Sequence, residues 1–175
     1  MPKKNLPTPK TCPLCKQALV IPSGPPNAVL GIIGEFPGEN ELRMLAPLIG
    51  GAGRIARKEL NSIGVSLDDC RVTNVWMHNP SEAPGEYEWH LAQAVKAVAG
   101  CKVVLLFGSD ASQAFLKENV GDVAGLITKS DILPGKIVVV SPNPAALVWG
   151  TVGEFRLALE KLSKIKEIKR AYKTK

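Results

Sequence analysis

A short stretch of the sequence, Gly-Glu-Phe-Pro-Gly at 34–38, combines a carboxylate and an aromatic ring with residues that shape a loop. Gly34 and Gly38 let the backbone approach a ligand closely, and Pro37 stiffens the loop. The preceding run, 28–33, is short, apolar and rich in β-branched residues, which is typical of a buried parallel strand. Because open α/β sheets bind ligands beyond the carboxyl ends of their strands, we expect 34–38 to belong to a ligand site.

Strand-like and helix-like segments alternate along the rest of the chain. Strands are expected at 28–34, 71–76, 102–107 and 136–140, and helices at 52–64, 86–99, 111–118 and 151–169. This alternation favours a parallel sheet with right-handed crossovers and with helices on both faces. We therefore predict an α/β fold, a three-layer α/β/α sandwich around a central four-stranded parallel sheet.

The chain of 175 residues fits one domain with a single core. We divide it into an irregular N-terminal arm with a C-x-x-C motif (1–27), a main domain (28–162) and a basic tail (163–175). The net charge of +6, concentrated at the two ends, favours a polyanionic partner. No 18-residue apolar run or hydrophobic signal core is present, so we expect a cytoplasmic protein without a membrane partner, and a monomer.

Five blocks of the sequence, in this order, resemble motifs of the uracil-DNA glycosylase superfamily, and of its iron–sulfur-containing family 4 in particular. They are GEFPG at 34–38, PLIGGAG at 47–53, TNV at 73–75, VVLLFG at 103–108 and NPAAL at 143–147. The resemblance implies a monofunctional DNA glycosylase. Such an enzyme flips a uracil-like or modified pyrimidine base out of DNA and hydrolyses its bond to the sugar, leaving an abasic site.

The resemblance also implies roles for residues of these blocks. Glu35 takes the position of the catalytic carboxylate, which stabilises an oxocarbenium-like state and orients the attacking water. Glu39 is the reserve candidate, and the alternative for Glu35 is that it caps a helical turn. Asn74 takes the position of the asparagine that holds the base, because an amide offers both a donor and an acceptor to the edge of the base. The alternative for Asn74 is that it holds its own loop.

Two departures from the family, Leu48 and Asn143, bear on the choice of base. Leu48 stands where the family has a phenylalanine that stacks on uracil, a contact worth about 1–3 kcal/mol, and Phe36 is the candidate to replace it. Asn143 stands where families 1 and 4 have a histidine that supports the departing base anion, and asparagine cannot become a cation. The pocket is therefore either less reactive toward plain uracil or shaped for a modified pyrimidine. Trp149 follows the motif and either fills the space left by the base in DNA or packs internally.

The four cysteines are expected to be reduced thiols or metal ligands. The resemblance implies a structural four-iron cluster, and Cys12 and Cys15 match its early C-x-x-C pair. Cys70 and Cys101 precede the second and third strands, and we predict that they complete the site. If the first strand lies between those two, the edge positions are about 10 Å apart, which a cluster bridges more easily than a single zinc ion. The family's third cysteine falls near His90. No cofactor is expected in the chemistry itself, and four thiols without metal are the alternative.

Basic residues near the C-terminus, among them Lys164, Lys169 and Arg170, are expected to contact DNA, the alternative being a solvated helix with a frayed end. Two other functions stay open. One is a catalytically weak member of the same superfamily that binds DNA or modified bases, which the missing histidine favours and Glu35 argues against. The other is a small-molecule nucleotide enzyme of the same fold class, which the basic ends disfavour.

Overall fold

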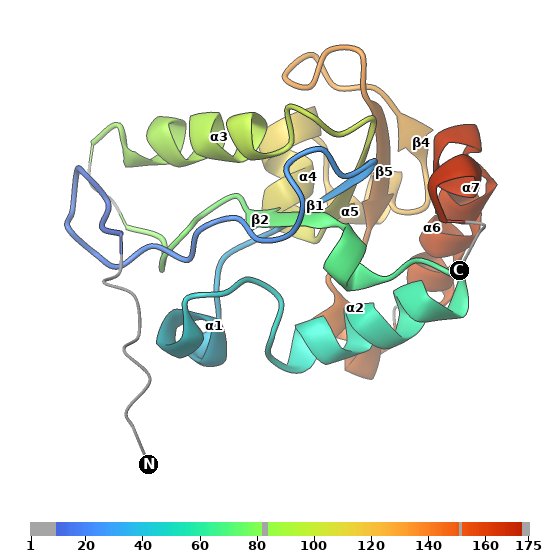
Figure 1. The fold of residues 1–175 in the computed structure, drawn as a ribbon, viewed down its shortest axis with the longest axis horizontal. Helices are drawn as coiled ribbons and strands as arrows, with labels where there is room; N and C mark the ends of the chain where they lie inside the picture. Colours follow the sequence, from blue (N-terminus) through green and yellow to red (C-terminus); the bar gives the residue numbers. More distant parts are fainter. Residues whose placement is uncertain (1–9, 82–83, 151, 173–175) are drawn as a thin grey trace.

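The computed structural model describes residues 10–81, 84–150 and 152–172, and its centre is a five-stranded sheet (Figure 1). The strands are β1 (Leu30–Gly34), β2 (Arg71–Asn74), β3 (Val103–Phe107), β4 (Ile127–Thr128) and β5 (Ile137–Ser141), in the order β2-β1-β3-β5-β4. Four strands are parallel, and β4 pairs antiparallel with β5. The expected α/β fold is confirmed. The expected total of four strands is wrong, because the two-residue β4, too short for a sequence pattern, adds an edge strand.

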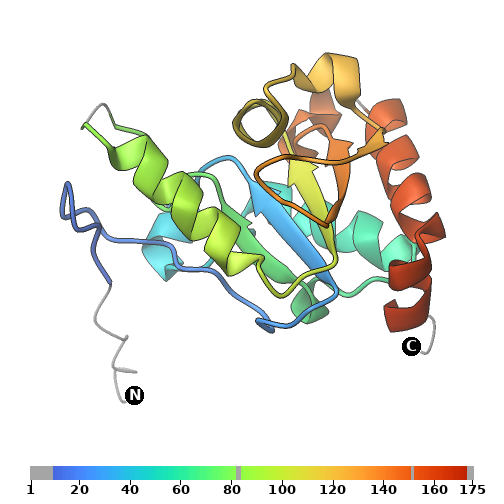
Figure 2. The ribbon, with the colours of Figure 1, turned by 90° about the horizontal axis from the view of Figure 1, so that it is seen from above.

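Helices cover both faces of the sheet. They are α1 (Glu39–Met44), α2 (Gly51–Ser62), α3 (Glu86–Ala97), α4 (Ser109–Leu116), α5 (Val120–Val123), α6 (Val152–Lys164) and α7 (Lys166–Tyr172), with 3-10 helices at Leu67–Asp69 and Pro144–Trp149. Figure 2 shows α3 along one face, while α2 and α6 lie across the sheet from it. Within the part of the chain that the structure describes, no helix has the length and apolar character needed to cross a membrane.

The two faces of the sheet carry separate hydrophobic cores. Leu30 and Ile32 point toward a core that α2, α6 and α7 complete, whereas Ile33 points toward a core completed by α3 and α4. This division follows from the period of two in a strand, which sends successive side chains to opposite faces. Because both faces are buried, the strand sequences are continuous apolar runs.

The C-terminal segment forms part of the main core. We expected a basic tail from residue 163, but α6 continues to Lys164 and α7 follows after a break at Ile165. Ile168 and Tyr172 are buried against the core on the α2 face. Burial of such side chains stabilises a fold by about 1.5–3 kcal/mol each, which is enough to hold this helix on the domain. Residues 173–175 lie outside the described part of the chain.

Candidate active site

A pocket of about 430 Å³ opens where β1 and β2 end, next to the last residue of β3. Five residues singled out in the sequence line it, namely Glu35, Phe36, Leu48, Asn74 and Asn143. They come from the end of β2 and from three loops, which meet here because parallel strands place their carboxyl ends at one edge of the sheet. Glu39, the reserve carboxylate, also lines the pocket.

The Glu35 carboxylate is held by two donors from distant parts of the chain. Its Oε1 accepts a hydrogen bond of 3.1 Å from the backbone N–H of Asp110, in the first turn of α4. Its Oε2 accepts one of 2.5 Å from the side-chain amide of Asn143. The partial positive charge at a helix N-terminus attracts a negatively charged side chain. Glu35 therefore does cap a helix, but the helix is α4 and not the turn that follows it in sequence.

Gly108 leaves the room that the Glu35 carboxylate occupies. Its backbone has φ +89° and ψ −176°, a conformation adopted almost only by glycine. A Cβ atom at this position would lie 2.4 Å from the carboxyl carbon of Glu35. Burial and, secondly, the nearby charge of Glu35 raise the pKa of Asp110, the next acidic residue along the chain. The carboxyl groups of Glu35 and Asp110 therefore lie close enough to interact at this edge of the pocket.

Asn74 ends β2 and is almost completely buried, with 4% of its surface exposed. Its Oδ1 lies where a Cβ of the neighbouring Gly34 would stand, at 2.5 Å, so this glycine makes space for the amide. Among the residues that the structure describes, no hydrogen-bond partner of the Asn74 side chain is found. The expected alternative, an asparagine that holds its own loop, therefore has no contact to support it.

Asn143 directly precedes the 3-10 helix, and both its amide oxygen and its amide nitrogen form hydrogen bonds. Its Oδ1 accepts from the backbone N–H of Ala145 at 2.9 Å, which caps the helix, and its Nδ2 donates to Glu35. A side-chain amide has two N–H groups, so one remains for a ligand. Asn143 therefore orients Glu35, a contact that the sequence could not reveal.

The loop that carries Leu48 is fixed by a residue that sequence reasoning missed. Glu41 is buried, and its Oε1 accepts hydrogen bonds from the backbone N–H groups of Ile49 at 3.1 Å and Gly50 at 2.6 Å. Leu48 itself has a positive φ of 52°. Gly53 packs against the Leu48 carbonyl so closely that an added Cβ would lie 1.8 Å from its oxygen. An acidic residue nine positions before the glycine pair at 50–51 was the available signal.

The structure describes the side chain of Phe36 but not that of Trp149, the two remaining residues proposed from the sequence. Phe36 lines the pocket and is half exposed, so its ring can contact a ligand there. Trp149 ends the 3-10 helix, but its side chain lies outside the described part. The proposed contact of Trp149 with DNA thus stays a prediction.

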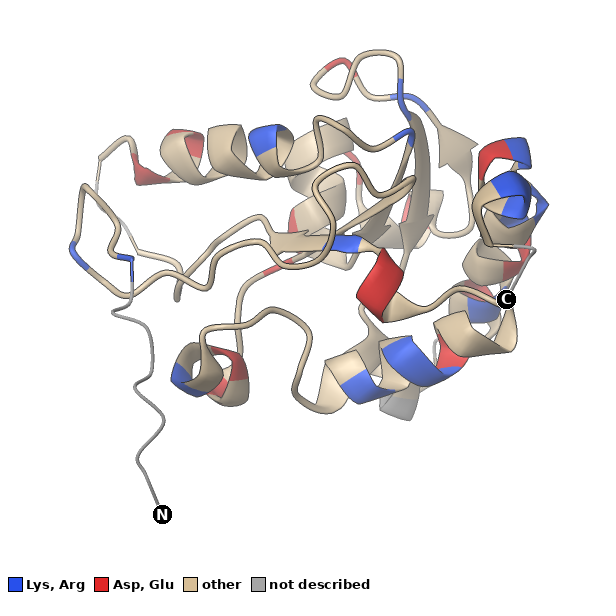
Figure 3. Cartoon of the chain, viewed as in Figure 1, with Lys and Arg blue, Asp and Glu red and all other residues tan. Residues whose placement is uncertain are grey.

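The basic residues of the C-terminus lie away from the pocket. Lys and Arg gather on α2 and on α7 (Figure 3). On α7, which carries Lys169 and Arg170, Tyr172 contacts the residues just before β2: its hydroxyl is 3.5 Å from the Asp69 carbonyl oxygen. This is the amino-terminal edge of the sheet, opposite the pocket.

Two basic residues outside α7, Lys164 and Arg54, differ in their ion pairs and in their distance from the pocket. Lys164 already forms an ion pair of 2.5 Å with Glu160. Arg54 is exposed in the first turn of α2, whose first residues line the pocket. Of these two basic residues, Arg54 is the better placed for a polyanion bound at the pocket.

The expected four-cysteine site is not assembled. Cys70 and Cys101 are buried in the cores on opposite faces of the sheet. Cys70 donates a hydrogen bond to the Ser66 carbonyl, and burial raises its pKa to about 12. Cys12 and Cys15 lie elsewhere, in an N-terminal hairpin whose two arms pair at Thr11 and Ala18. These positions do not fit a cluster held by all four thiolates.

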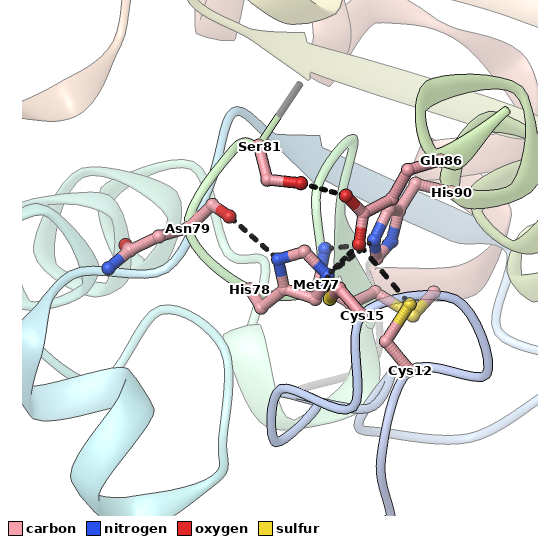
Figure 4. A network of polar contacts seen from close by, with 8 residues as sticks. All are labelled: Cys12, Cys15, Met77, His78, Asn79, Ser81, Glu86 and His90. Atoms are coloured by element: carbon pink, nitrogen blue, oxygen red, sulfur yellow. Dashed lines mark hydrogen bonds and ion pairs between the residues drawn. The ribbon is translucent and has the colours of Figure 1, made fainter. Parts of the chain in front are cut away.

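Cys12 and Cys15 instead meet the two histidines of the chain (Figure 4). Ligand atoms of Cys12, His78, Glu86 and His90, all four buried, lie within 4.8 Å of one another. Cys15 Sγ is 3.3 Å from His78 Nε2. In the described part of the chain, no other group of three or more such side chains is close enough to share an ion. Sequence reasoning noted His90 but missed His78 and Glu86.

Comparison with known proteins agrees with this architecture. The family model described as "Uracil DNA glycosylase superfamily" matches residues 21–163. A type-4 uracil-DNA glycosylase of Thermotoga maritima is 27% identical over 167 residues, which cover 89% of this chain and 86% of that protein. A type-4 uracil-DNA glycosylase of Saccharolobus solfataricus is 29% identical over 140 residues, or 72% of this chain and 65% of that protein. The pocket, the sheet and these matches together show that the chain belongs to the uracil-DNA glycosylase superfamily.

Proposed function

We propose that this protein is a monofunctional DNA glycosylase that excises a uracil-like or modified pyrimidine base from DNA. Membership of the superfamily and relatives named as uracil-DNA glycosylases support a DNA substrate and a hydrolytic reaction. The observation that carries the proposal is the Glu35 carboxylate, held by Asn143 and by α4 at the rim of a pocket that also contains Asn74.

In the proposed mechanism, the target base leaves the stack and enters the pocket. The unpaired Asn74 amide donates to and accepts from the edge of the base, and Phe36 stacks on its face. As the bond between base and sugar breaks, positive charge develops on the sugar. The Glu35 carboxylate stabilises that charge and accepts a hydrogen bond from the water that attacks C1′. The base leaves with its electron pair, and the second N–H of Asn143 stabilises the resulting anion.

The test is incubation with duplex and single-stranded oligonucleotides that carry uracil, hypoxanthine, 5-hydroxymethyl or glucosylated pyrimidines, followed by alkali to reveal abasic sites. We expect strand cleavage only after alkali, because a monofunctional enzyme leaves the sugar intact. Cleavage before alkali would contradict monofunctional chemistry. If no base in the panel yields an abasic site, a protein that only binds DNA or modified bases becomes the better explanation.

A further inference from the structure

The cluster at the N-terminal hairpin has the composition of a metal site different from the one that the family resemblance implies. We propose that Cys12, Cys15, His78 and His90 bind a single structural zinc ion. Two thiolates and two imidazoles are a common ligand set for structural zinc. A four-iron cluster is held by four thiolates, and Cys70 and Cys101 are in the cores instead.

Three polar atoms crowd His78 Nε2. Glu86 Oε1 lies 2.8 Å from it, His90 Nε2 2.9 Å and Cys15 Sγ 3.3 Å (Figure 4). An imidazole nitrogen carries either one proton or one lone pair, so it cannot satisfy three partners. One of these contacts is satisfied in the metal-free protein, because the Met77 N–H donates to His90 Nδ1 at 3.3 Å and the proton of neutral His90 is therefore on Nε2, facing His78; zinc binding through His90 Nε2 moves that proton to Nδ1 and breaks the Met77 contact.

A tetrahedral zinc ion with bonds of about 2.0–2.3 Å separates its ligand atoms by roughly 3.3–3.8 Å. The 3.3 Å between Cys15 Sγ and His78 Nε2 matches this spacing, the 2.9 Å between the two histidine nitrogens is shorter, and Cys12 lies within 4.8 Å of both histidines.

The hairpin presents both cysteines from one tight turn. The Cys12 carbonyl accepts from the Lys16 N–H at 3.0 Å, and the Cys12 N–H donates to the Gln17 carbonyl at 2.8 Å. Lys16, directly after Cys15, has a φ of +66°, which closes the turn. A C-x-x-C spacing on such a turn brings two thiolates to one ion. The local backbone is therefore already shaped for the ion.

The contact of His78 Nδ1 with a backbone carbonyl directs the lone pair of its Nε2 into the cluster. His78 Nδ1 is 2.7 Å from the Asn79 carbonyl oxygen, an acceptor, so Nδ1 carries the proton and Nε2 keeps its lone pair. Glu86 is bound on its other oxygen by the Ser81 hydroxyl. Since two thiolates already balance the charge of Zn²⁺, we place Glu86 beside the ion rather than on it. Cys12, His78 and His90 are buried and Cys15 is partly exposed, and four protein ligands are the complement of a structural zinc site.

An iron centre with two cysteines and two histidines would require a different geometry. In such a centre the thiolates bind one iron and the imidazoles bind the other. Here, Cys15 Sγ and His78 Nε2 are 3.3 Å apart, a separation that suits two ligands of the same ion. The zinc would link the hairpin to α3 and to the segment that leaves β2 just after Asn74. Its loss should therefore lower thermal stability.

The first experiment measures metal in the whole protein after expression with zinc and iron and purification without oxygen. We expect one zinc per chain, no acid-labile sulfide, and a lower Tm after chelation that added zinc restores. Cobalt in place of zinc should give the absorption of a tetrahedral ion with thiolate ligands. Stoichiometric iron with sulfide, or protein that binds less than half an equivalent of zinc, would overturn the proposal.

Variants test the ligand set. Cys15→Ser should lose most of the zinc, whereas His90→Cys, which exchanges one ligand for another, should retain it. Cys101→Ala and Glu86→Gln are the matched controls, and both should keep one zinc per chain. Because the cobalt spectrum is recorded on the unaltered protein, a variant that fails to fold does not decide the question. Zinc lost from Glu86→Gln but kept by Cys15→Ser would contradict the assigned ligands.

Discussion

The Asn143 side-chain amide donates a hydrogen bond of 2.5 Å to the Glu35 carboxylate, although the two residues are 108 positions apart in the chain. Asn143 also caps its own 3-10 helix through Oδ1, so its amide cannot rotate without losing a second contact. With the Asp110 N–H on the other oxygen, Glu35 has its carboxylate fixed before a substrate arrives. Such preorganisation is how a charged group stabilises a transition state without reorganising.

Gly108→Ala should displace Glu35 and reduce base excision. The backbone conformation at Gly108 is nearly restricted to glycine, and the new Cβ would lie 2.4 Å from the Glu35 carboxyl carbon. We expect a loss of stability of about 1–3 kcal/mol, together with a fall in the single-turnover rate. Gly121→Ala is the matched control, since its Cβ would meet no atom within 4 Å. An active and equally stable Gly108→Ala protein would show that Glu35 does not depend on this space.

Leu48→Phe combined with Asn143→His should shift the substrate preference toward uracil. The first change restores an aromatic ring at the pocket, and the second supplies a group that can carry positive charge near the departing base. We expect the unaltered protein to excise at least one substituted pyrimidine faster than uracil. Single-turnover rates on both bases measure this ratio. If uracil is already the best substrate, or the ratio does not move in the double variant, these positions do not set specificity.

Arg54→Ala should weaken DNA binding more than the double variant Lys169→Ala with Arg170→Ala. Arg54 is close to the pocket, whereas α7 packs at the opposite edge of the sheet. Each lost phosphate contact should reduce the slope of log affinity against log salt by about 0.9 on duplex DNA. We expect this reduction for Arg54→Ala and an unchanged slope for the α7 variant. The reverse result would place the DNA on α7, as the charge of the sequence first suggested.

Thiol labelling should separate the cysteines into two classes. Burial raises the pKa of Cys70 to about 12 and that of Cys15 to about 11, so accessibility rather than the pKa separates them. Cys70 and Cys101 are buried, and a reagent in solvent cannot reach their thiols in the folded protein. After treatment with a chelator, we expect Cys15, which is partly exposed, to react with an alkylating agent first. Peptide mass spectrometry identifies the labelled residues, with denatured protein as the control in which all four react. Rapid labelling of Cys70 in the native state would contradict its burial.

Much of the pocket could be predicted from the sequence for a physical reason. The buried strands are short apolar runs, and a parallel sheet places the residues that follow them at one edge. Glu35 and Asn74 were therefore expected to lie together, and both line the pocket. The contact between Asn143 and Glu35 could not be predicted, because it depends on side-chain orientation across two loops.

The metal ligands were harder to predict, because the segment after β2 has no periodic pattern that fixes its path. Cys70 and Cys101 were chosen for their position at the edge of the sheet, but their side chains point into the cores. His78 follows Asn74 by only four residues and lies with His90, 12 residues later. That both histidines of the chain occur within this short segment was the available signal.

The C-terminal helix shows how charge can hide a core pattern. The many lysines suggested a tail in solvent, yet Ile165, Ile168 and Tyr172 recur at helical spacing and are buried. Their spacing of three and four residues is that of one helix face. The spacing of these apolar residues, considered apart from the charge, predicts a helix that packs on the core of the domain.

The most direct test of the proposed function is the single-turnover rate of base excision by Glu35→Gln, measured beside its DNA affinity. Glutamine keeps the shape and its oxygen can still accept from the Asp110 N–H, so the fold should persist. Its amide nitrogen takes the place of the oxygen that accepts from Asn143, so the hydrogen bond between these two residues is lost with the charge. We expect the rate to fall by at least about 100-fold with nearly unchanged affinity, as for an interaction made chiefly in the transition state. Glu39→Gln, in the same pocket, should stay close to the unaltered rate. A Glu35→Gln protein that excises bases as fast as the unaltered one would remove this carboxylate from the mechanism.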